Sequence, residues 1–526
     1  MTRNKILAIA AAMTVMLTGC SYGYESDRNE KAKQTGNTDV SEDAGALGEL
    51  NSTVERLLEL TEESGNDEQI KECIAQLLDL HSGIFEDYEM AQMNYYKDIN
   101  DKAAGDACDE AGSDYYAADD ALYFAFSQGY NTDYQELFTD LVDLDYLDYY
   151  GASRMTLKKC EKNARESYES TDELQDSYYD AVYGDDFDMD ELRLECAQMY
   201  LDTIQEIREE DFYGTFDRDY SPEDIMDISG TVYENLIPVY NRYLDELASI
   251  DGYEKIYDAS ADPDPFGTIA KYAGSISPVV GESARRISEE KLYTLTSGDN
   301  AVEMGYTVDL PKSDRAWIYN YSYGYSLLGD CIHEFGHFHA ALCDPSYIFN
   351  AKHNMDIGEI QSQAMEILFL RFYDDIYGEQ SRARRIDKIL DLVDSVLMGF
   401  AIGEFEARVY QERDDITPEE VLELYDDIVG SIDPDYEFCY IDHLFTQPGY
   451  FVSYGVSALA AFSFFDDALN SPETAYATYD KLSEVSCASG EYTFRKALEH
   501  CGIEDVLSDS NIKKLAIDLN ANAGKI

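Results

Sequence analysis

Three of the seven histidines in this 526-residue chain lie in one short segment, HEFGHFH at 333–339. A helix places residues i and i+4 on one face, so His333 and His337 can direct ring nitrogens toward one Zn²⁺. Glu334, beside the first histidine, can then take a proton from a water molecule that the metal activates. The pattern therefore predicts a catalytic zinc site; two histidines packed in a core are the alternative.

A catalytic zinc needs a third protein ligand. The pattern HExxHxxGxxH would place glycine and histidine where this chain has Ala340 and Cys343, which excludes that class. The segment DIGEIQSQAMEILFL instead supplies Glu359, Gln363 and Glu366 at i, i+4 and i+7, one stripe of a predicted helix. We expect this stripe to bind the metal and to hold a ligand histidine through its second ring nitrogen, with a solvated acidic stripe as the alternative.

Two other histidines are rival ligands. His339 comes two residues after His337 and points away from its face of the helix. His353 lies in a predicted loop. The segment SLLGDCIHEFGHFHAALC is apolar around the motif and lacks proline, which favours a helix there.

The rest of the chain predicts the elements that position these residues. From about residue 50 the helical period begins, with Ile70, Ile74, Leu77 and Leu78 on one face. Alternating segments such as KLYTLTSG and AVEMGYTVDLP predict a small sheet near 290–320. Helical patterns then run to about 402 and again from 416 to the end. The apolar run VSYGVSALAAFSFF at 452–465 is too short for a membrane span and predicts a buried helix.

The HEFGH helix followed by E-x-x-S-Q-x-x-E resembles the thimet oligopeptidase and oligoendopeptidase F family of zinc metallopeptidases. The resemblance implies that Glu359 is the third zinc ligand and that Glu366 supports the metal site. It also implies that AWIYNY, which contains Asn320, is a strand along the active-site edge. Gln361 stands where the family usually has proline, and the family's additional histidine would fall at 340 rather than at His339.

A late segment, DHLFTQPGYFVSYGVSALAA, resembles the part of the same family whose side chains bind the substrate and the tetrahedral oxyanion. His443, Tyr450 and Tyr454 are the candidates for this role. A positioned phenol or imidazole donor stabilises charge that develops on the carbonyl oxygen. Because the chain has 44 tyrosines, packing is the alternative for the two tyrosines.

The resemblance implies a mainly α fold, with two lobes around a deep substrate channel and a small β-sheet at the active-site edge. The implied activity is a zinc-dependent endopeptidase, with one catalytic ion, acting on short unstructured oligopeptides. Other zinc peptidases that share HExxH and a downstream glutamate, such as carboxypeptidases and dipeptidyl carboxypeptidases, remain open. A peptide-binding surface lipoprotein without catalysis is a further alternative.

The N-terminus has the pattern of an export signal. MTRNK is basic, Ile6 to Leu17 is largely apolar, and LTGC ends at Cys20, which resembles a bacterial lipobox. We therefore expect a lipoprotein signal peptide at 1–20, a lipid on Cys20, and a flexible polar tether at 21–48. The protein would face outward on the cell membrane. The folded part would comprise an N-terminal helical region, 49–250, and a zinc-binding catalytic region, 251–526.

The charge of the chain excludes one class of partner. It has 107 acidic and 39 basic residues, a net charge of −68, and such a field repels phosphate backbones, so we expect no nucleic-acid binding. Nine cysteines besides Cys20 are widely spaced, with no CxxC pair. Export would permit some bridges among them, but their pairing cannot be read from the sequence.

Overall fold

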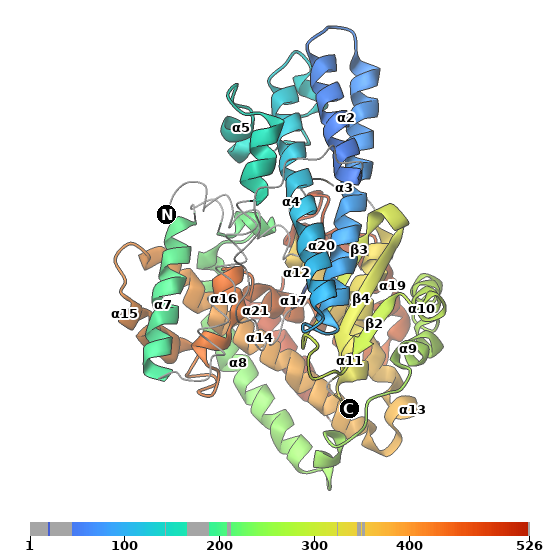
Figure 1. The fold of residues 1–526 in the computed structure, drawn as a ribbon. Coiled ribbons are helices and arrows are strands. Elements are labelled where there is room, and N and C mark those ends of the chain that lie inside the picture. The colour runs from blue at the N-terminus through green and yellow to red at the C-terminus, as the bar shows by residue number, and fades with distance from the viewer. Residues whose placement is uncertain are drawn as a thin grey trace.

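Helices form most of the protein, as the mainly α prediction requires (Figure 1). The computed structural model describes residues 19–20, 45–142, 144–165, 189–207, 212–322, 324–344, 349 and 353–523. Most of the predicted signal peptide and of the tether lies outside the described residues. Helix α2 already begins at Ala46 and buries Leu47, so the folded part starts slightly before the predicted end of the tether.

The first lobe, at the top of Figure 1, consists of consecutive helices that pack side by side. These are α2 (Ala46–Thr61), α3 (Asp67–Tyr96), α4 (Lys102–Tyr130) and α5 (Leu144–Tyr150). The predicted stripe of α3 is confirmed, since Ile70, Ile74 and Leu77 are buried. With other buried residues between 47 and 160, and with Phe349, they form what we term the small core.

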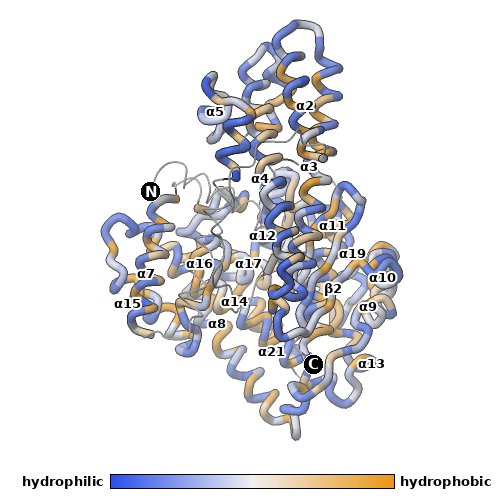
Figure 2. The backbone as a smooth tube through the Cα atoms, viewed as in Figure 1, coloured by the Kyte–Doolittle hydropathy of each residue, from blue (hydrophilic) through white to orange (hydrophobic). Residues whose placement is uncertain are grey.

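The remaining helices surround a second and larger cluster, the large core, whose buried residues lie between 192 and 523. They are α7 (Met189–Glu206), α8 (Pro222–Ala248), α9 (Pro265–Ala273), α10 (Pro278–Glu290), α11 (Leu327–Cys343), α12 (Met355–Phe369), α13 (Tyr373–Tyr377), α14 (Ser381–Glu412), α15 (Pro418–Ile428), α16 (Asp442–Thr446), α17 (Val452–Ala461), α18 (Phe465–Asn470), α19 (Pro472–Leu482), α20 (Phe494–Cys501) and α21 (Asp509–Asn522). Figure 2 shows the segregation that drives this packing, with hydrophilic residues over the outer surface and hydrophobic residues where helices meet.

The predicted boundary between 250 and 251 does not coincide with the division between the cores. Helix α8 packs along α14, and its apolar face, which includes Val232 and Leu236, belongs to the large core. The physical reason is that the apolar stripe of an amphipathic helix can pack against either core. The helical period of the sequence does not show which of the two cores will bury it. Helix α17 is buried along its length, as predicted. Within the described residues, no helix is both long and apolar enough to cross a bilayer.

Local signals in the sequence explain where several helices begin. Ser221 and Thr417 each form a capping box at the start of α8 and α15, and a proline follows each of them. Ser277 caps α10 in a similar way, again before a proline. Seven of the nine cysteines after Cys20 are buried.

The predicted sheet is present and lies beside α3 and α11 (Figure 1). Its strands are β1 (Gly19–Cys20), β2 (Tyr293–Thr296), β3 (Gly305–Leu310) and β4 (Arg315–Tyr321), in the order β1-β3-β4-β2. The β3–β4 pair is antiparallel and the β4–β2 pair is parallel. On the outer edge of β3, Gly19 pairs with Tyr306 and Cys20 with Gly305. The sheet therefore carries an extended segment on the edge next to β3, and β3 and β4 contact the HEFGH helix.

Candidate active site

The three predicted metal ligands come together. His333 and His337 lie one turn apart on α11, and Glu359 lies on the neighbouring helix α12. Glu359 Oε2 is 3.4 Å from His333 Nε2 and 3.7 Å from His337 Nε2, and the three potential ligand atoms all lie within 4.8 Å of one another. Two imidazole nitrogens and one carboxylate oxygen form a donor set typical of catalytic zinc. These residues therefore fit one Zn²⁺.

A glycine within the motif allows the two ligand helices to approach. A Cβ atom at Gly336 would lie 2.5 Å from the Cα of Ser362 and 2.8 Å from the carbonyl oxygen of Gln361. Any side chain here would push α12 away from α11, and Glu359 with it. The middle of HEFGH therefore fixes the distance between the histidines and the glutamate.

The start of α12 is fixed by a buried ion pair. Arg218 Nε lies 3.3 Å from Asp356 Oδ2, and both side chains are fully buried. The same guanidinium donates to the carbonyl of Gly449 at 2.6 Å and to Ser453 Oγ at 2.7 Å. Arg218 thus ties the helix of Glu359 to the segment that contains Tyr450. A buried pair with this many hydrogen bonds fixes geometry, because removing one partner leaves an uncompensated charge.

Glu334 points away from the ligand group and toward β3. It is 3% exposed, and Thr307 donates from Oγ1 to its Oε2 at 2.7 Å. A Cβ atom at Gly305 would lie 3.3 Å from Glu334 Oε1, so the strand passes close to this carboxylate. Burial raises the pKa of Glu334 to about 7, and the charge of Glu359 adds to the rise. A carboxylate with such a pKa can take up and return a proton near neutral pH.

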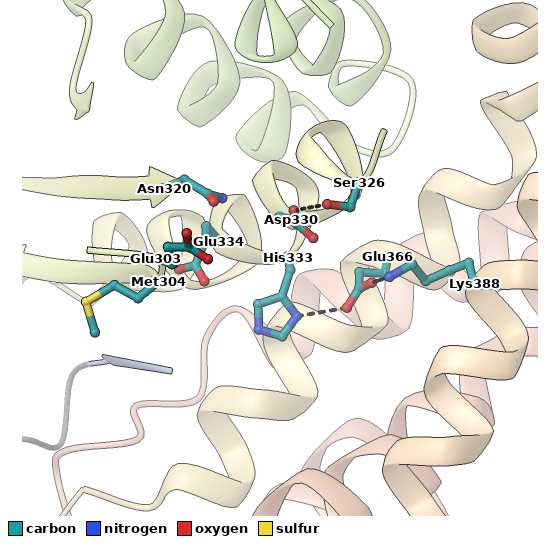
Figure 3. Close-up of a pocket in the computed structure, with 11 residues that line it drawn as sticks. Glu303, Met304, Asn320, Ser326, Asp330, His333, Glu334, Glu366 and Lys388 are labelled. Atoms are coloured by element: carbon teal, nitrogen blue, oxygen red, sulfur yellow. Dashed lines mark hydrogen bonds and ion pairs between the residues drawn. The ribbon is translucent and has the colours of Figure 1, made fainter. Parts of the chain in front are cut away.

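Glu366 supports the first histidine, as the sequence predicts. Its Oε1 lies 2.8 Å from His333 Nδ1, which leaves Nε2 to face Glu359. Lys388, on α14, lies 2.5 Å from the other oxygen of Glu366 (Figure 3). Burial opposes ionisation of Glu366, yet the positive charge of Lys388 and the contact with His333 hold its pKa at about 2. Glu366 is thus an anion that can orient a neutral imidazole.

The late segment brings its three candidates next to the ligands. The ring of His443 stacks on that of Tyr450, with centroids 4.8 Å apart, and burial lowers the pKa of His443 to about 4. The Tyr450 hydroxyl donates to Glu359 Oε1 at 3.4 Å. The Tyr454 hydroxyl lies 3.4 Å from His443 Nε2. Tyr450 therefore contacts a ligand directly, while His443 and Tyr454 form a pair beside it.

The remaining candidates have other surroundings. His339 is fully buried, with Ser283 Oγ 2.9 Å from Nδ1 and Ser483 Oγ 3.0 Å from Nε2, so it holds helices together. His353 lies outside the group of ligand atoms. Gln363 donates to the carbonyl of Tyr454 at 3.5 Å and thereby links α12 to α17.

A cavity of about 220 Å³ opens beside these groups and is lined by His333, Glu334, Gly305 and Glu366, among others (Figure 3). Besides Arg218, two further residues that contribute to the site were not predicted. Thr307, which donates a hydrogen bond to Glu334, lies on β3, and the sequence does not show that β3 packs against α11. Lys388 had a weak signal, since it lies on the buried stripe of a helix that also buries Arg384.

No family model and no curated protein matches this sequence. Solved structures do match. A PZ peptidase A with an inhibitor has a TM-score of 0.67 at 16% identity, with 91% of this chain and 97% of that chain covered. An X-ray structure assigned as an oligoendopeptidase F has a TM-score of 0.64 at 15% identity, with the same coverage. A second, from Bacillus anthracis str. Ames, has a TM-score of 0.59 at 14% identity and covers 91% and 96%.

This chain has the oligoendopeptidase F fold. The likeness extends over nearly the full length of both chains, so it includes the first lobe, where the sequence offers helical character alone. It confirms the predicted fold class, mainly α with a small sheet beside the HEFGH helix. At this level of identity the likeness concerns the fold, and the chemistry depends on the residues described above.

Proposed function

We propose that this chain is an exported zinc endopeptidase that hydrolyses short unstructured oligopeptides. The proposal rests on the different positions of the three ligand residues and of Glu334. Three neighbouring side chains, His333, His337 and Glu359, offer ligand atoms to one metal ion. Glu334 faces the open strand β3 instead, and its pKa of about 7 suits a general base.

A bound Zn²⁺ would supply a Lewis acid that polarises the scissile carbonyl and lowers the pKa of water to about 7. Glu334 would take a proton from the attacking water and pass it to the amine nitrogen as the C–N bond breaks. His443 and Tyr454, which lie 3.4 Å apart beside the ligands, would donate hydrogen bonds to the oxyanion. Each such donor is worth a few kcal/mol in the transition state.

The outer edge of β3 suits an extended peptide. Gly19 and Cys20 pair with it in antiparallel register, next to Gly305 and within reach of Glu334. An added strand gains main-chain hydrogen bonds whatever its side chains are, which suits a peptidase of broad range. Removal of a signal peptide before Cys20 would take Gly19 off this edge and leave the edge to a substrate.

The lipobox-like LTGC supports the proposal that the mature protein begins with an acylated Cys20 at the outer face of the cell membrane. The polar segment that follows would then serve as the tether. The net charge of −68 disfavours adsorption to anionic lipid, so membrane binding would depend on the acyl chains.

The decisive experiment compares the wild type with Glu334→Gln, both purified from the membrane fraction, on a mixed pool of short peptides. We expect internal cuts from the wild type and a loss of at least ~10³-fold in the variant, with zinc still bound, because Glu334 is not a ligand. Mass spectrometry reads the cuts, and the N-terminal mass of the same samples shows whether Cys20 is acylated.

A matched control is Glu89→Gln, which changes an equally buried glutamate in the first lobe and should leave the cuts unchanged. Peptides with a blocked C-terminus separate the alternatives, since a carboxypeptidase or dipeptidyl carboxypeptidase would fail on them and an endopeptidase would not. If the wild type binds zinc and cuts nothing, the protein is a peptide-binding lipoprotein and the proposal is wrong.

A further inference from the structure

We propose that Lys388 is a positioning residue of the metal site, which fixes His333 through Glu366. The inference rests on the proposed function in one respect, because it takes His333 to be a metal ligand. It adds a residue from α14, a helix that carries none of the HEFGH or glutamate motifs. Lys388 acts on His333 through Glu366, whose carboxylate contacts both of them.

The contacts form a short chain. Lys388 Nζ lies 2.5 Å from Glu366 Oε2, and Glu366 Oε1 lies 2.8 Å from His333 Nδ1. Figure 3 shows the three side chains in a row, from α14 across α12 to α11. Lys388 has a second acidic neighbour on its own helix, Asp391, at 3.3 Å. The Lys388 side chain is 17% exposed and that of Glu366 is 5% exposed, so solvent screens this contact little.

This geometry has two consequences for His333. Because each oxygen of Glu366 has its own partner, rotation of the carboxylate would break one contact or the other. The imidazole is thereby held with Nδ1 toward Glu366 and Nε2 toward Glu359, 3.4 Å away. The ammonium of Lys388 also compensates the buried negative charge of Glu366. Without it, Glu366 and His333 would tend to share a proton, and His333 Nε2 would bind a metal less strongly.

A purely structural role for Lys388 predicts something different. If Lys388 only neutralises a buried carboxylate for folding, its loss lowers stability and leaves the metal affinity of the folded protein unchanged. Lys388 also lines the cavity beside His333, so direct contact with a substrate is a further possibility. That role would change KM and not zinc binding. Zinc affinity therefore separates a positioning role from the other two roles without an assay of peptide cleavage.

The experiment measures the zinc affinity of the metal-free full-length protein by competition with a chromogenic chelator. We expect Lys388→Met to weaken zinc binding about 10- to 100-fold, the usual effect of losing a residue that orients a ligand. Lys388→Arg, which keeps the charge, should recover part of the loss. The matched control is Lys71→Met, which removes the same kind of Lys–Glu pair at the surface, 2.9 Å from Glu68, and should change nothing.

A double-variant cycle tests the route through the carboxylate. In the background of Glu366→Gln, Lys388→Met should weaken zinc binding by less than two-fold more, because its only route to His333 is gone. This double variant contains no unpaired buried carboxylate, so it provides the test even if Lys388→Met alone does not fold. Wild-type affinity in Lys388→Met, or an undiminished effect in the Glu366→Gln background, would overturn the inference. Failure of the wild type to bind zinc would instead count against the proposed function.

Discussion

Two buried glutamates, one in each lobe, have pKa values shifted in opposite directions. Glu89, on α3, is 1% exposed, and burial raises its pKa to about 8. Its Oε2 has no hydrogen-bond partner among the described residues. Glu366 is 4% exposed, yet the charge of Lys388 and the contact with His333 outweigh burial and hold its pKa at about 2.

The difference shows that burial alone does not mark a functional carboxylate. In the first lobe the buried acid is tolerated and reduces stability. At the candidate site, three buried glutamates each have a partner that fixes them: Thr307 for Glu334, Lys388 for Glu366, and Tyr450 for Glu359. What distinguishes the candidate site is that its buried carboxylates have fixed partners. We expect substitutions in the first lobe to change stability, and substitutions at the site to change zinc affinity as well.

One of the contacts between the two regions is made by Phe349, which lies between α11 and α12. Phe349 is 4% exposed and is the only member of the small core, among the described residues, that comes from beyond position 160. Its ring centroid lies 4.9 Å from that of Tyr123 and 5.4 Å from those of His81 and Phe126. The small core is therefore completed by a residue from the segment between α11 and α12.

Phe349→Ala should have the largest effect on stability. Removing a buried phenylalanine costs about 3–5 kcal/mol. We expect the loss in the first lobe, because the ring packs there, and hydrogen exchange of the amides in α3 and α4 measures it. Zinc affinity should stay within a factor of two of the wild type.

The control for this substitution is Leu144→Ala, in the same lobe, where the side chain is 67% exposed and the cost should be below ~0.5 kcal/mol. Faster exchange in α11 and α12, with α3 and α4 unaffected, would mean that Phe349 stabilises the ligand helices rather than the small core.

Gly336→Ala should have the next largest effect and should act at the site. The new methyl group would meet backbone atoms of Ser362 and Gln361, which cannot move aside as a side chain can. Overpacking of this kind costs about 1–3 kcal/mol. We also expect zinc affinity to fall at least ~10-fold, since the histidines and Glu359 are carried by the two helices that would be forced apart.

Gly358→Ala is the matched control, because it lies next to Glu359 on α12 and a Cβ there would meet no atom within 4 Å. It should leave zinc affinity unchanged and raise stability by up to ~1 kcal/mol through helix propensity. Equal zinc affinity in the two alanine variants would show that the helix crossing does not set the ligand geometry.

The ligand group could be predicted from sequence because it depends on local spacing. His333 and His337 are one helical turn apart, and Glu359 and Glu366 lie on one stripe of the next helix, so two helices suffice to assemble them. The strands β2 and β3 were predicted for a similar reason, from alternation of residues over short segments, whereas the strand that contains Asn320 was implied by the family resemblance.

The partners of these residues could not be predicted, because tertiary packing chooses them. Lys388 reaches Glu366 from a helix that the sequence places 22 positions away, and Arg218 reaches Asp356 from 138 positions away. Neither pairing leaves a periodic signal. The same limit applies to α8, since its apolar stripe does not specify which core buries it.

Glu89→Gln should have an effect on stability whose size depends on pH. Between the ordinary pKa of a glutamate, 4.5, and about 8, folded protein keeps a proton on Glu89 that unfolded protein releases. The stability of the wild type therefore falls as pH rises through this window, and the variant lacks that contribution. We expect the two to be similar at pH 5 and the variant to be more stable by about 1–3 kcal/mol at pH 8.5, as measured by urea unfolding.

Glu366→Gln should change stability in the opposite direction to Glu89→Gln, so the two variants together test the comparison most directly. Because the pKa of Glu366 is lowered to about 2, its contribution to stability is present above 4.5 and is lost as pH falls toward 2. Glu366→Gln should therefore destabilise the protein at pH 7, whereas Glu89→Gln should stabilise it there. If both variants shifted stability in the same direction at pH 7, partners such as Lys388 would not be what separates the two carboxylates.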